Sequence, residues 1–143
     1  MEVYIFSSST LTNIWAGIGA KMWAVQNYEK PEFVTRAKNM PLGSLGLFYC
    51  VETKSFTTPF LVVSVPVIKT IDNVWPEEWI LPFAIKPLGC PNKQIHKDDL
   101  GEVPLIKGRE NKWHHLLHIQ PNAAFAATEM SNEDWSIFLN RLL

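Results

Sequence analysis

The run PFLVVSVPV at residues 59–67 restricts the possible folds of this chain more than any other segment. Its apolar residues are mostly β-branched and nearly continuous, and prolines border the run. A strand with this pattern is covered on both faces of a sheet or lies in a closed barrel, because a face open to water favours alternating polar side chains. We therefore expect a buried strand here, with other elements packed on both sides of it.

Shorter patterns predict the neighbouring elements. Residues 3–6 are rich in strand formers and lead into the polar cluster SSST, which is typical of a strand followed by a turn into a helix. Ser9 or Thr10 is the expected N-cap of a helix at 11–16, and Gly17 and Gly19 are expected to end that helix. The other predicted strands are 45–51, 81–88 and a small one at 123–127.

The C-terminal segment predicts a capped helix with one apolar stripe. Ser131 and Asp134 resemble a capping box. The residues of the stripe, at helical spacing, are Trp135, Phe138, Leu139 and Leu142. A weaker helix is predicted at 32–38 and a short one near Asp98, whereas 113–119 fits either a helix or a strand. This order predicts an α+β fold in which a mixed sheet or barrel packs against outer helices.

The composition is that of a globular protein without a strong charge. The 143 residues are 47% hydrophobic and 19% charged with a net charge of −1, so we expect a single domain over 1–143 and no strongly basic surface. No apolar run reaches the roughly 18 residues of a spanning helix, and no secretory signal is evident. Cys50 and Cys90 stand apart, so we expect free thiols and a cytoplasmic protein, or a nuclear one in a eukaryote.

No pattern in the sequence assembles a catalytic or a metal centre. P-loop, GxSxG and GxGxxG motifs are absent, and adjacent carboxylates such as Glu77 and Glu78 are expected to be solvated loop charges. His114 and His118 have the i, i+4 spacing of two metal ligands on a helix, but no third ligand is evident. The sequence therefore predicts a binding protein rather than an enzyme, with no metal and no cofactor.

The six tryptophans are the strongest indication of a ligand site. Trp15 and Trp135 fall on apolar helical stripes, which predicts that they fill the core. Trp23, Trp75 and Trp79 fall on predicted connections, where an aromatic ring held by a rigid sheet can stack on a flat heterocycle. Such stacking contributes roughly 1–3 kcal/mol per base. Two facing rings can hold a base that has been turned out of its stack.

The order of these landmarks resembles the EVE and YTH domains of the PUA-like superfamily, which read modified bases in RNA or DNA. The resemblance covers nearly the whole chain. It rests on the strand VYIFSSS followed by Asn13, Trp23 ten residues later, the turn MPLGSLGLFYCV, the strand FLVVSVPV, the loop and strand VWPEEWILPFAIKPL, and the ending PNAAFAATEMSNEDWSIFLNRLL. One departure is the pair Gly43-Ser44, where the family usually has Gly-Asp.

The resemblance implies a fold, a function and a set of site residues. The fold is a small twisted barrel of about five or six strands with helices packed outside. The function is to bind a modified base, N6-methyladenine or a modified cytosine, flipped into an aromatic cage. The implied site comprises two cage walls, a side chain on the base edge, a backbone carbonyl for the methylated amino group, and two serines. The cage walls are Trp23 and either Trp75 or Trp79, and the side chain on the base edge is Asn13. The backbone carbonyl is that of Ala24, and the two serines are Ser7 and Ser8.

The resemblance also implies partners. The ligand is a nucleic acid carrying the modified base, and no membrane is involved. Relatives of this kind include recognition domains of McrB-type modification-dependent restriction systems, which implies a fused or associated NTPase or nuclease. The residues expected to contact phosphates are Lys21, Lys30, Arg36, Lys38 and Arg109, with Lys107 and Lys112 as further candidates.

Two alternatives to a base reader stay open at this point. ASCH relatives in the same superfamily include amidohydrolases that act on acylated cytidine. Gly19 and Lys21 fit the start of their GxKxxTxR-like motif, but the threonine and arginine are missing from the residues that follow. The other alternative is a protein-interaction module that uses an exposed tryptophan surface.

Overall fold

The computed structural model describes residues 1–26, 31–120 and 123–143 of the chain. The strands are β1 (Glu2–Ser8), β2 (Met22–Gln26), β3 (Leu45–Cys50), β4 (Ser55–Val62), β5 (Thr70–Ile71), β6 (Trp79–Pro87), β7 (Gln94–His96) and β8 (Ala127–Glu129). The helices are α1 (Leu11–Ala20), α2 (Pro31–Lys38), α3 (Trp113–Leu116) and α4 (Asn132–Leu142), with 3₁₀ helices η1 (Lys97–Glu102) and η2 (Glu110–Lys112).

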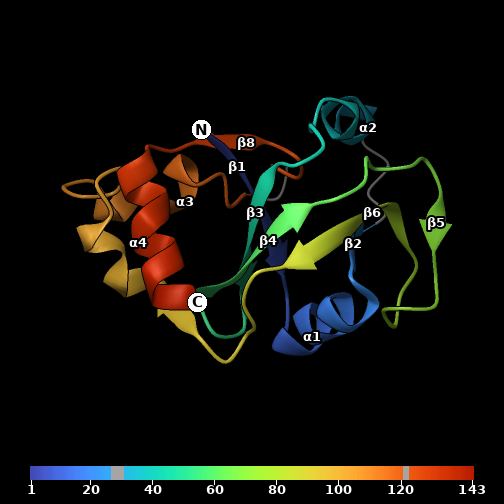
Figure 1. Ribbon diagram of the computed structural model, residues 1–143, viewed down its shortest axis with the longest axis horizontal. Helices are drawn as coiled ribbons and strands as arrows, with labels where there is room; N and C mark the ends of the chain where they lie inside the picture. Colours follow the sequence, from blue (N-terminus) through green and yellow to red (C-terminus); the bar gives the residue numbers. More distant parts are fainter. Residues whose placement is uncertain (27–30, 121–122) are drawn as a thin grey trace.

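The strands form one curled sheet (Figure 1). Within the described residues the neighbour order is β2-β6-β4-β3-β1-β8, and the short strands β5 and β7 pair with β6 and β4. β1 runs parallel to β3, and the other pairings are antiparallel. The result is a half-barrel with helices outside, which confirms the predicted α+β architecture.

The alternation of side chains along the strands gives the sheet a core on each face. In β1, Tyr4 and Phe6 join the core that α1 and α2 cover, whereas Val3 and Ile5 join the core that α4 covers. Figure 1 shows α3 and α4 together on one side of the sheet, with α1 and α2 beyond its other side. The core under α1 and α2 is rich in aromatic rings.

The run at 59–67 is a strand only as far as Val62, where β4 ends. Up to that point the strand is almost wholly buried, as predicted. The valines beyond it that are exposed to solvent are Val63, Val65 and Val67. Pro66 has no N–H to donate, so a regular ladder cannot pass through it. The prediction of a covered strand is therefore wrong for residues 63–67.

Helix α1 is longer than predicted and turns another face to the core. It passes through both glycines to Ala20 and ends where Lys21 adopts a left-handed conformation with φ 52°. Its buried residues are Ile14 and Gly17, while Trp15 points outward and is 50% exposed. The predictions that the glycines end the helix and that Trp15 fills the core are therefore wrong. The buried stripe includes a glycine, which a hydropathy pattern does not count as apolar.

Strands β2, β5 and β7 were not predicted, and the remaining elements lie near their predicted positions. The ambiguous segment 113–119 contains the single helical turn α3, the short helix near Asp98 is η1, and the weak helix at 32–38 is α2. The small strand predicted at 123–127 is wrong in position, because β8 begins only at Ala127, where it pairs with β1.

Both cysteines are free thiols, as predicted. Cys50 is buried in the aromatic core, and Cys90 is half-buried with its thiol donating to the side-chain oxygen of Asn92 (2.6 Å). Across the described residues, no helix combines the length and apolarity needed to cross a bilayer.

The capping box predicted for the terminal helix is present. The backbone N–H of Asp134 donates to Ser131 Oγ (3.1 Å), and the Asp134 carboxylate accepts the N–H of Ser131 (2.8 Å). Its other oxygen accepts the N–H of Leu105 (2.8 Å), so this buried acid also ties α4 to the segment after η1. The apolar residues of α4 that are buried are Trp135, Phe138 and Leu142.

We predict that Asp134→Ala lowers the free energy of unfolding by about 1–3 kcal/mol, because the N–H groups of Ser131 and Leu105 lose their acceptor. Asn140→Ala on the exposed side of the same helix is the matched control and should change that free energy by less than about 0.5 kcal/mol. Urea denaturation followed by circular dichroism measures both. Equal stability of Asp134→Ala and wild type would show that these bonds contribute nothing to stability.

Candidate functional site

A cavity of about 240 Å³ lies at the seam between β1 and β2, where the curled sheet is not closed. β1 pairs with β3 along one edge, but on its other edge β8 reaches only residues 2–4. β2 pairs with β6. Within the described chain, no strand covers the second half of β1 on its free edge or β2 on the edge away from β6. These two edges border the cavity.

The seam leaves backbone hydrogen-bonding groups beside the cavity. β1 and the turn after it contribute residues 5–9 to the lining, and β2 contributes residues 23–26. Phe6 and Ala24 on these edges are buried. Buried backbone N–H and C=O groups nearly always have a hydrogen-bond partner, and no strand of the described chain supplies one on these two edges. A ligand with several donors and acceptors on its own edge fits such a site.

Trp23 belongs to β2 rather than to a loop, and it serves both the core and the cavity lining. It is 1% exposed, and its ring centroid lies 4.5 Å from that of Phe48. Its ring plane is nearly perpendicular to those of Trp75 (82°) and Trp79 (76°). The rings that the resemblance assigns to the cage walls therefore meet edge to face in this structure.

Gly17 allows α1 to lie directly on the Trp23 ring. A Cβ at Gly17 would lie 2.8 Å from Cε3 of Trp23 and 2.9 Å from the carbonyl oxygen of Met22. Both distances are shorter than van der Waals contact, so only glycine fits there without movement. A Cβ at Gly19, two residues on, would meet nothing within 4 Å.

The two glycines make a matched pair for experiment. Gly19→Ala should raise the free energy of unfolding by up to about 1 kcal/mol, because alanine is the better helix residue. Gly17→Ala should lower it by about 1–3 kcal/mol, because the new methyl group overpacks the core and displaces the Trp23 ring. Chemical denaturation and tryptophan fluorescence measure stability and ring environment. A Gly17→Ala protein as stable as Gly19→Ala would contradict the tight packing.

Trp75 and Trp79 stack on each other, with ring centroids 4.0 Å apart and ring planes 10° apart. Trp79 is the first residue of β6 and lines the cavity, whereas Trp75 stands outside the lining. The indole N–H of Trp75 donates to the backbone carbonyl of Asn13 (2.9 Å). All three predicted site tryptophans are buried, so they offer no exposed tryptophan surface to a protein partner.

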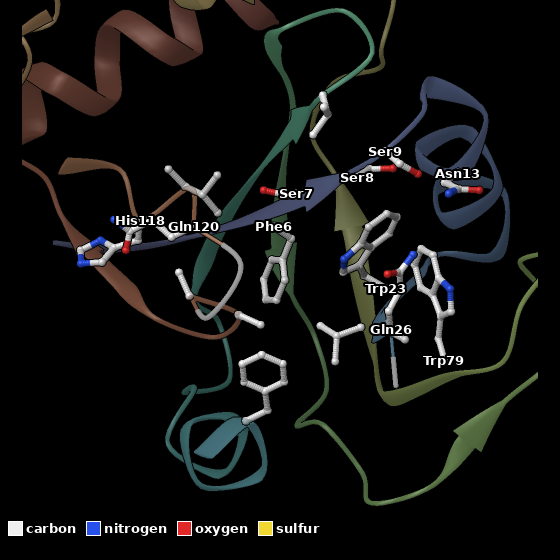
Figure 2. A pocket seen from close by; sticks show the side chains of 17 residues that line it. Phe6, Ser7, Ser8, Ser9, Asn13, Trp23, Gln26, Trp79, His118 and Gln120 are labelled. Carbon is white, nitrogen blue, oxygen red and sulfur yellow. The ribbon is translucent and has the colours of Figure 1, made fainter. Parts of the chain in front are cut away.

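Asn13 lies in the first turn of α1 with its backbone held from two sides. Its N–H donates to the Thr10 hydroxyl (3.1 Å), and its carbonyl accepts the Trp75 indole. Its side-chain amide lines the cavity and makes no hydrogen bond to the residues that the structure describes. Figure 2 shows it on the same side of the cavity as Trp23 and Trp79. A free carboxamide offers two donors and one acceptor.

Ala24 occupies an irregular point of β2. The pairing of β2 with β6 shifts register between Trp23 and Val25, so Ala24 has no partner residue in the ladder. Bulges of this kind re-aim the backbone next to functional sites. Ala24 is buried and lines the cavity, and its role as a carbonyl acceptor stays a prediction from the resemblance.

The serines and the far wall complete the lining. Ser7 is exposed at the cavity, and the buried Ser8 donates its hydroxyl proton to the Thr10 carbonyl (2.8 Å). Across from the tryptophans lie His118 and Gln120, as Figure 2 shows. The ring Nδ1 of His118 is 2.9 Å from the Thr128 hydroxyl.

Sequence reasoning missed several lining residues. Phe6, Phe33, His118 and Gln120 all border the cavity. The two phenylalanines have the signature of ordinary core residues, and the far wall lies more than 100 residues from β1 in the chain. No local pattern signals that these segments meet.

The predicted phosphate contacts do not gather at one place. Arg36 of α2 donates to the Ala124 carbonyl (3.1 Å) at the cavity wall, and its guanidinium lies 5.8 Å from the Phe33 ring centroid. Lys21 and Lys38 are exposed at the ends of α1 and α2. The cations of the segment around η2, none of which lines the cavity, are Lys107, Arg109 and Lys112. Lys30 lies outside the described residues.

Two residues with shifted pKa values lie away from the cavity. A hydrogen bond from Lys97 holds the pKa of Asp98 below its usual range, and burial raises the pKa of Tyr4. Neither residue lines the cavity. Within the described residues, no group of three or more His, Cys, Asp or Glu side chains is placed to hold a metal ion.

The structure thus brings most of the predicted site residues to one cavity. Those in its lining are Asn13, Trp23, Ala24, Trp79, Ser7 and Ser8. Trp75 is the exception, since it contacts this group without lining the cavity. Their roles toward a base stay predictions.

Comparison with known proteins identifies solved structures of similar fold. No protein-family model and no curated protein matches the sequence. The YTH domain of Zygosaccharomyces rouxii MRB1 in complex with N6-methyladenosine RNA matches with a TM-score of 0.65 and 12% identity, over 99% of this chain and 87% of that one. The YTH domain-containing protein mmi1, in an RNA complex, matches with a TM-score of 0.64 and 14% identity, over 98% and 80%.

A third structure aligns over less of the chain. The Toxoplasma CPSF4 YTH domain in complex with an m6A-modified RNA matches with a TM-score of 0.55 and 20% identity, over 73% of this chain and 71% of that one. These structural matches confirm the fold that the order of sequence landmarks predicted.

Proposed function

We propose that this chain, which has the fold of YTH domains, binds one modified nucleobase in the cavity at the seam between β1 and β2. The observation that carries the proposal is the side-chain amide of Asn13, which makes no hydrogen bond to the described residues, is fixed at its backbone and lies in the same lining as Trp23 and Trp79. We favour N6-methyladenine in RNA as the ligand, because the structures with the same fold include complexes with N6-methyladenosine RNA.

The size of the cavity supports a single base as the ligand. Its volume of about 240 Å³ falls below the roughly 300–1,000 Å³ of pockets for drug-sized molecules. A base can enter such a space only when it has left the stack with its neighbours, which favours a flexible single strand. The edges of β1 and β2 then supply backbone donors and acceptors along the rim of the base.

Selectivity for a methyl group requires more than apolar burial. Burying one methyl contributes only about 0.8 kcal/mol. A methylated amino group keeps a single N–H, which we assign to the Ala24 carbonyl as acceptor, while its methyl group meets aromatic surface. An unmethylated base leaves this apolar space unfilled and one N–H without a partner, and an unpaired buried donor costs about 1–3 kcal/mol. The two effects act in the same direction.

The proposal concerns binding and includes no chemical step. The cations at the ends of α1 and α2, Lys21 and Lys38, are the proposed phosphate contacts, and the net charge of −1 predicts modest affinity for the backbone. Binding of DNA, and association with a restriction NTPase or nuclease, stay predictions from the resemblance. DNA oligonucleotides in the binding experiment test the first of these.

Asn13→Ala should lower the affinity for single-stranded RNA containing N6-methyladenine about tenfold or more, because a hydrogen-bonding contact to the base edge is worth about 1–3 kcal/mol. Thr12→Ala is the matched control, since Thr12 is exposed on the same helical turn and does not line the cavity. Fluorescence anisotropy with matched methylated and unmethylated RNA and DNA strands, and strands carrying modified cytosines, measures both. Equal binding of modified and unmodified strands by the wild type would overturn the proposed function.

A further inference from the structure

We infer that Trp75 is a positioning residue for base recognition, which holds Asn13 and Trp79 in place without touching the base. The inference rests on the proposed function and deepens it, because it separates the two tryptophans between which the family resemblance does not choose. Trp79 lines the cavity, and Trp75 contacts the lining from outside.

The first contact fixes Asn13. The Trp75 indole N–H donates to the Asn13 carbonyl at 2.9 Å, across a separation of 62 residues in the chain. The Asn13 N–H is held by Thr10 at the start of α1. With both backbone groups bonded, the direction in which the Asn13 side chain leaves the helix is set. The amide itself stays available for a base edge.

The second contact fixes Trp79. The Trp75 ring lies flat against the Trp79 ring at 4.0 Å. Trp75 also meets Trp23 edge to face, with centroids 5.3 Å apart. Three rings therefore form one block, in which Trp79 cannot turn without displacing Trp75. A rigid ring loses little entropy when a base stacks on it or contacts its edge.

The third observation concerns the loop that carries Trp75. Residues 72, 73 and 76–78 of this loop are exposed, whereas Trp75 is 4% exposed. Trp75 joins the loop between β5 and β6 to α1 through its hydrogen bond to Asn13. Because it joins α1 to the start of β6, it sets the distance between Asn13 and Trp79. That distance determines whether one base can contact both.

Trp75→Phe removes the N–H donor and keeps an aromatic ring. We expect it to lower the affinity for methylated RNA about tenfold and to reduce the preference over unmethylated RNA, since the Asn13 carbonyl loses a buried hydrogen bond. Trp135→Phe is the matched control. Trp135 is also buried, but it lies in α4 on the opposite core, away from the cavity. This control should keep the wild-type preference.

A double-mutant cycle separates positioning from general stability. If Trp75 acts through Asn13, then Trp75→Phe should change the preference for methylated RNA little when Asn13→Ala is already present. A merely structural role would lower stability in both backgrounds and leave the effects on preference independent. Should Trp75→Phe not fold, 3-benzothienylalanine at position 75 retains the shape of the ring pair and replaces the N–H by sulfur.

The outcomes distinguish failure of the Trp75 role from failure of base recognition. A wild type that prefers methylated RNA, together with Trp75 variants that keep that preference, overturns the role of Trp75 and leaves the proposed function standing. Independent effects of Trp75→Phe and Asn13→Ala on preference also overturn it. A wild type without any preference overturns the proposed function itself. The inference is supported if Trp75→Phe reduces the preference for methylated RNA in the wild-type background and causes no further reduction when Asn13→Ala is already present.

Discussion

The indole of Trp23 packs at once against Gly17 of α1, Phe48 of β3 and the stacked pair Trp75 and Trp79. This packing joins the first helix, the centre of the sheet and the loop before β6 around one side chain. Because protein interiors are close-packed, a change in the position of this ring is transmitted to each of these elements. The same ring borders the cavity, so the stability of this core and the shape of the site depend on one set of contacts.

The unclosed seam between β1 and β2 is the second constraint, and it follows from the topology. The connection through α1 carries the chain from β1 at one side of the sheet to β2 at its far end, with β3, β4 and β6 between them. Free strand edges are a liability, because they can pair with other chains. Here the curl of the sheet turns both edges inward toward a cavity. The geometry that leaves the half-barrel open is thus also the source of its backbone hydrogen-bonding groups.

Local signals in the sequence predicted local structure well. The polar cluster before α1 contains its cap, Thr10, and the capping box of Ser131 and Asp134 starts α4. These devices act within one turn of a helix, so a short window of sequence contains all their partners. The order of such landmarks was enough to predict the fold. The site prediction came from the family resemblance, which named the residues without the distances between them.

Burial was harder to predict than secondary structure. Trp15 lies on helix α1 and Trp75 lies in the loop before β6, yet Trp15 is 50% exposed and Trp75 is 4% exposed. Hydropathy favoured a buried Trp15, because the pattern could not show that the core face of α1 centres on Gly17. The exposed valines after β4 were misjudged for a related reason, since hydropathy could not show that Val63, Val65 and Val67 lie open to solvent.

The sequence by itself determined the caps, the positions of the four strands β1, β3, β4 and β6, the α+β class and the set of residues that the resemblance assigns to a base. Only the tertiary structure decided which tryptophan lines the cavity, which one bonds Asn13 from outside the lining, and that the two free strand edges border the same cavity. The physical reason is the separation along the chain between the residues that interact. Caps and periodicity act between residues a few positions apart, whereas the site is made by contacts such as Trp75 to Asn13, 62 residues apart, which exist only after the sheet has curled.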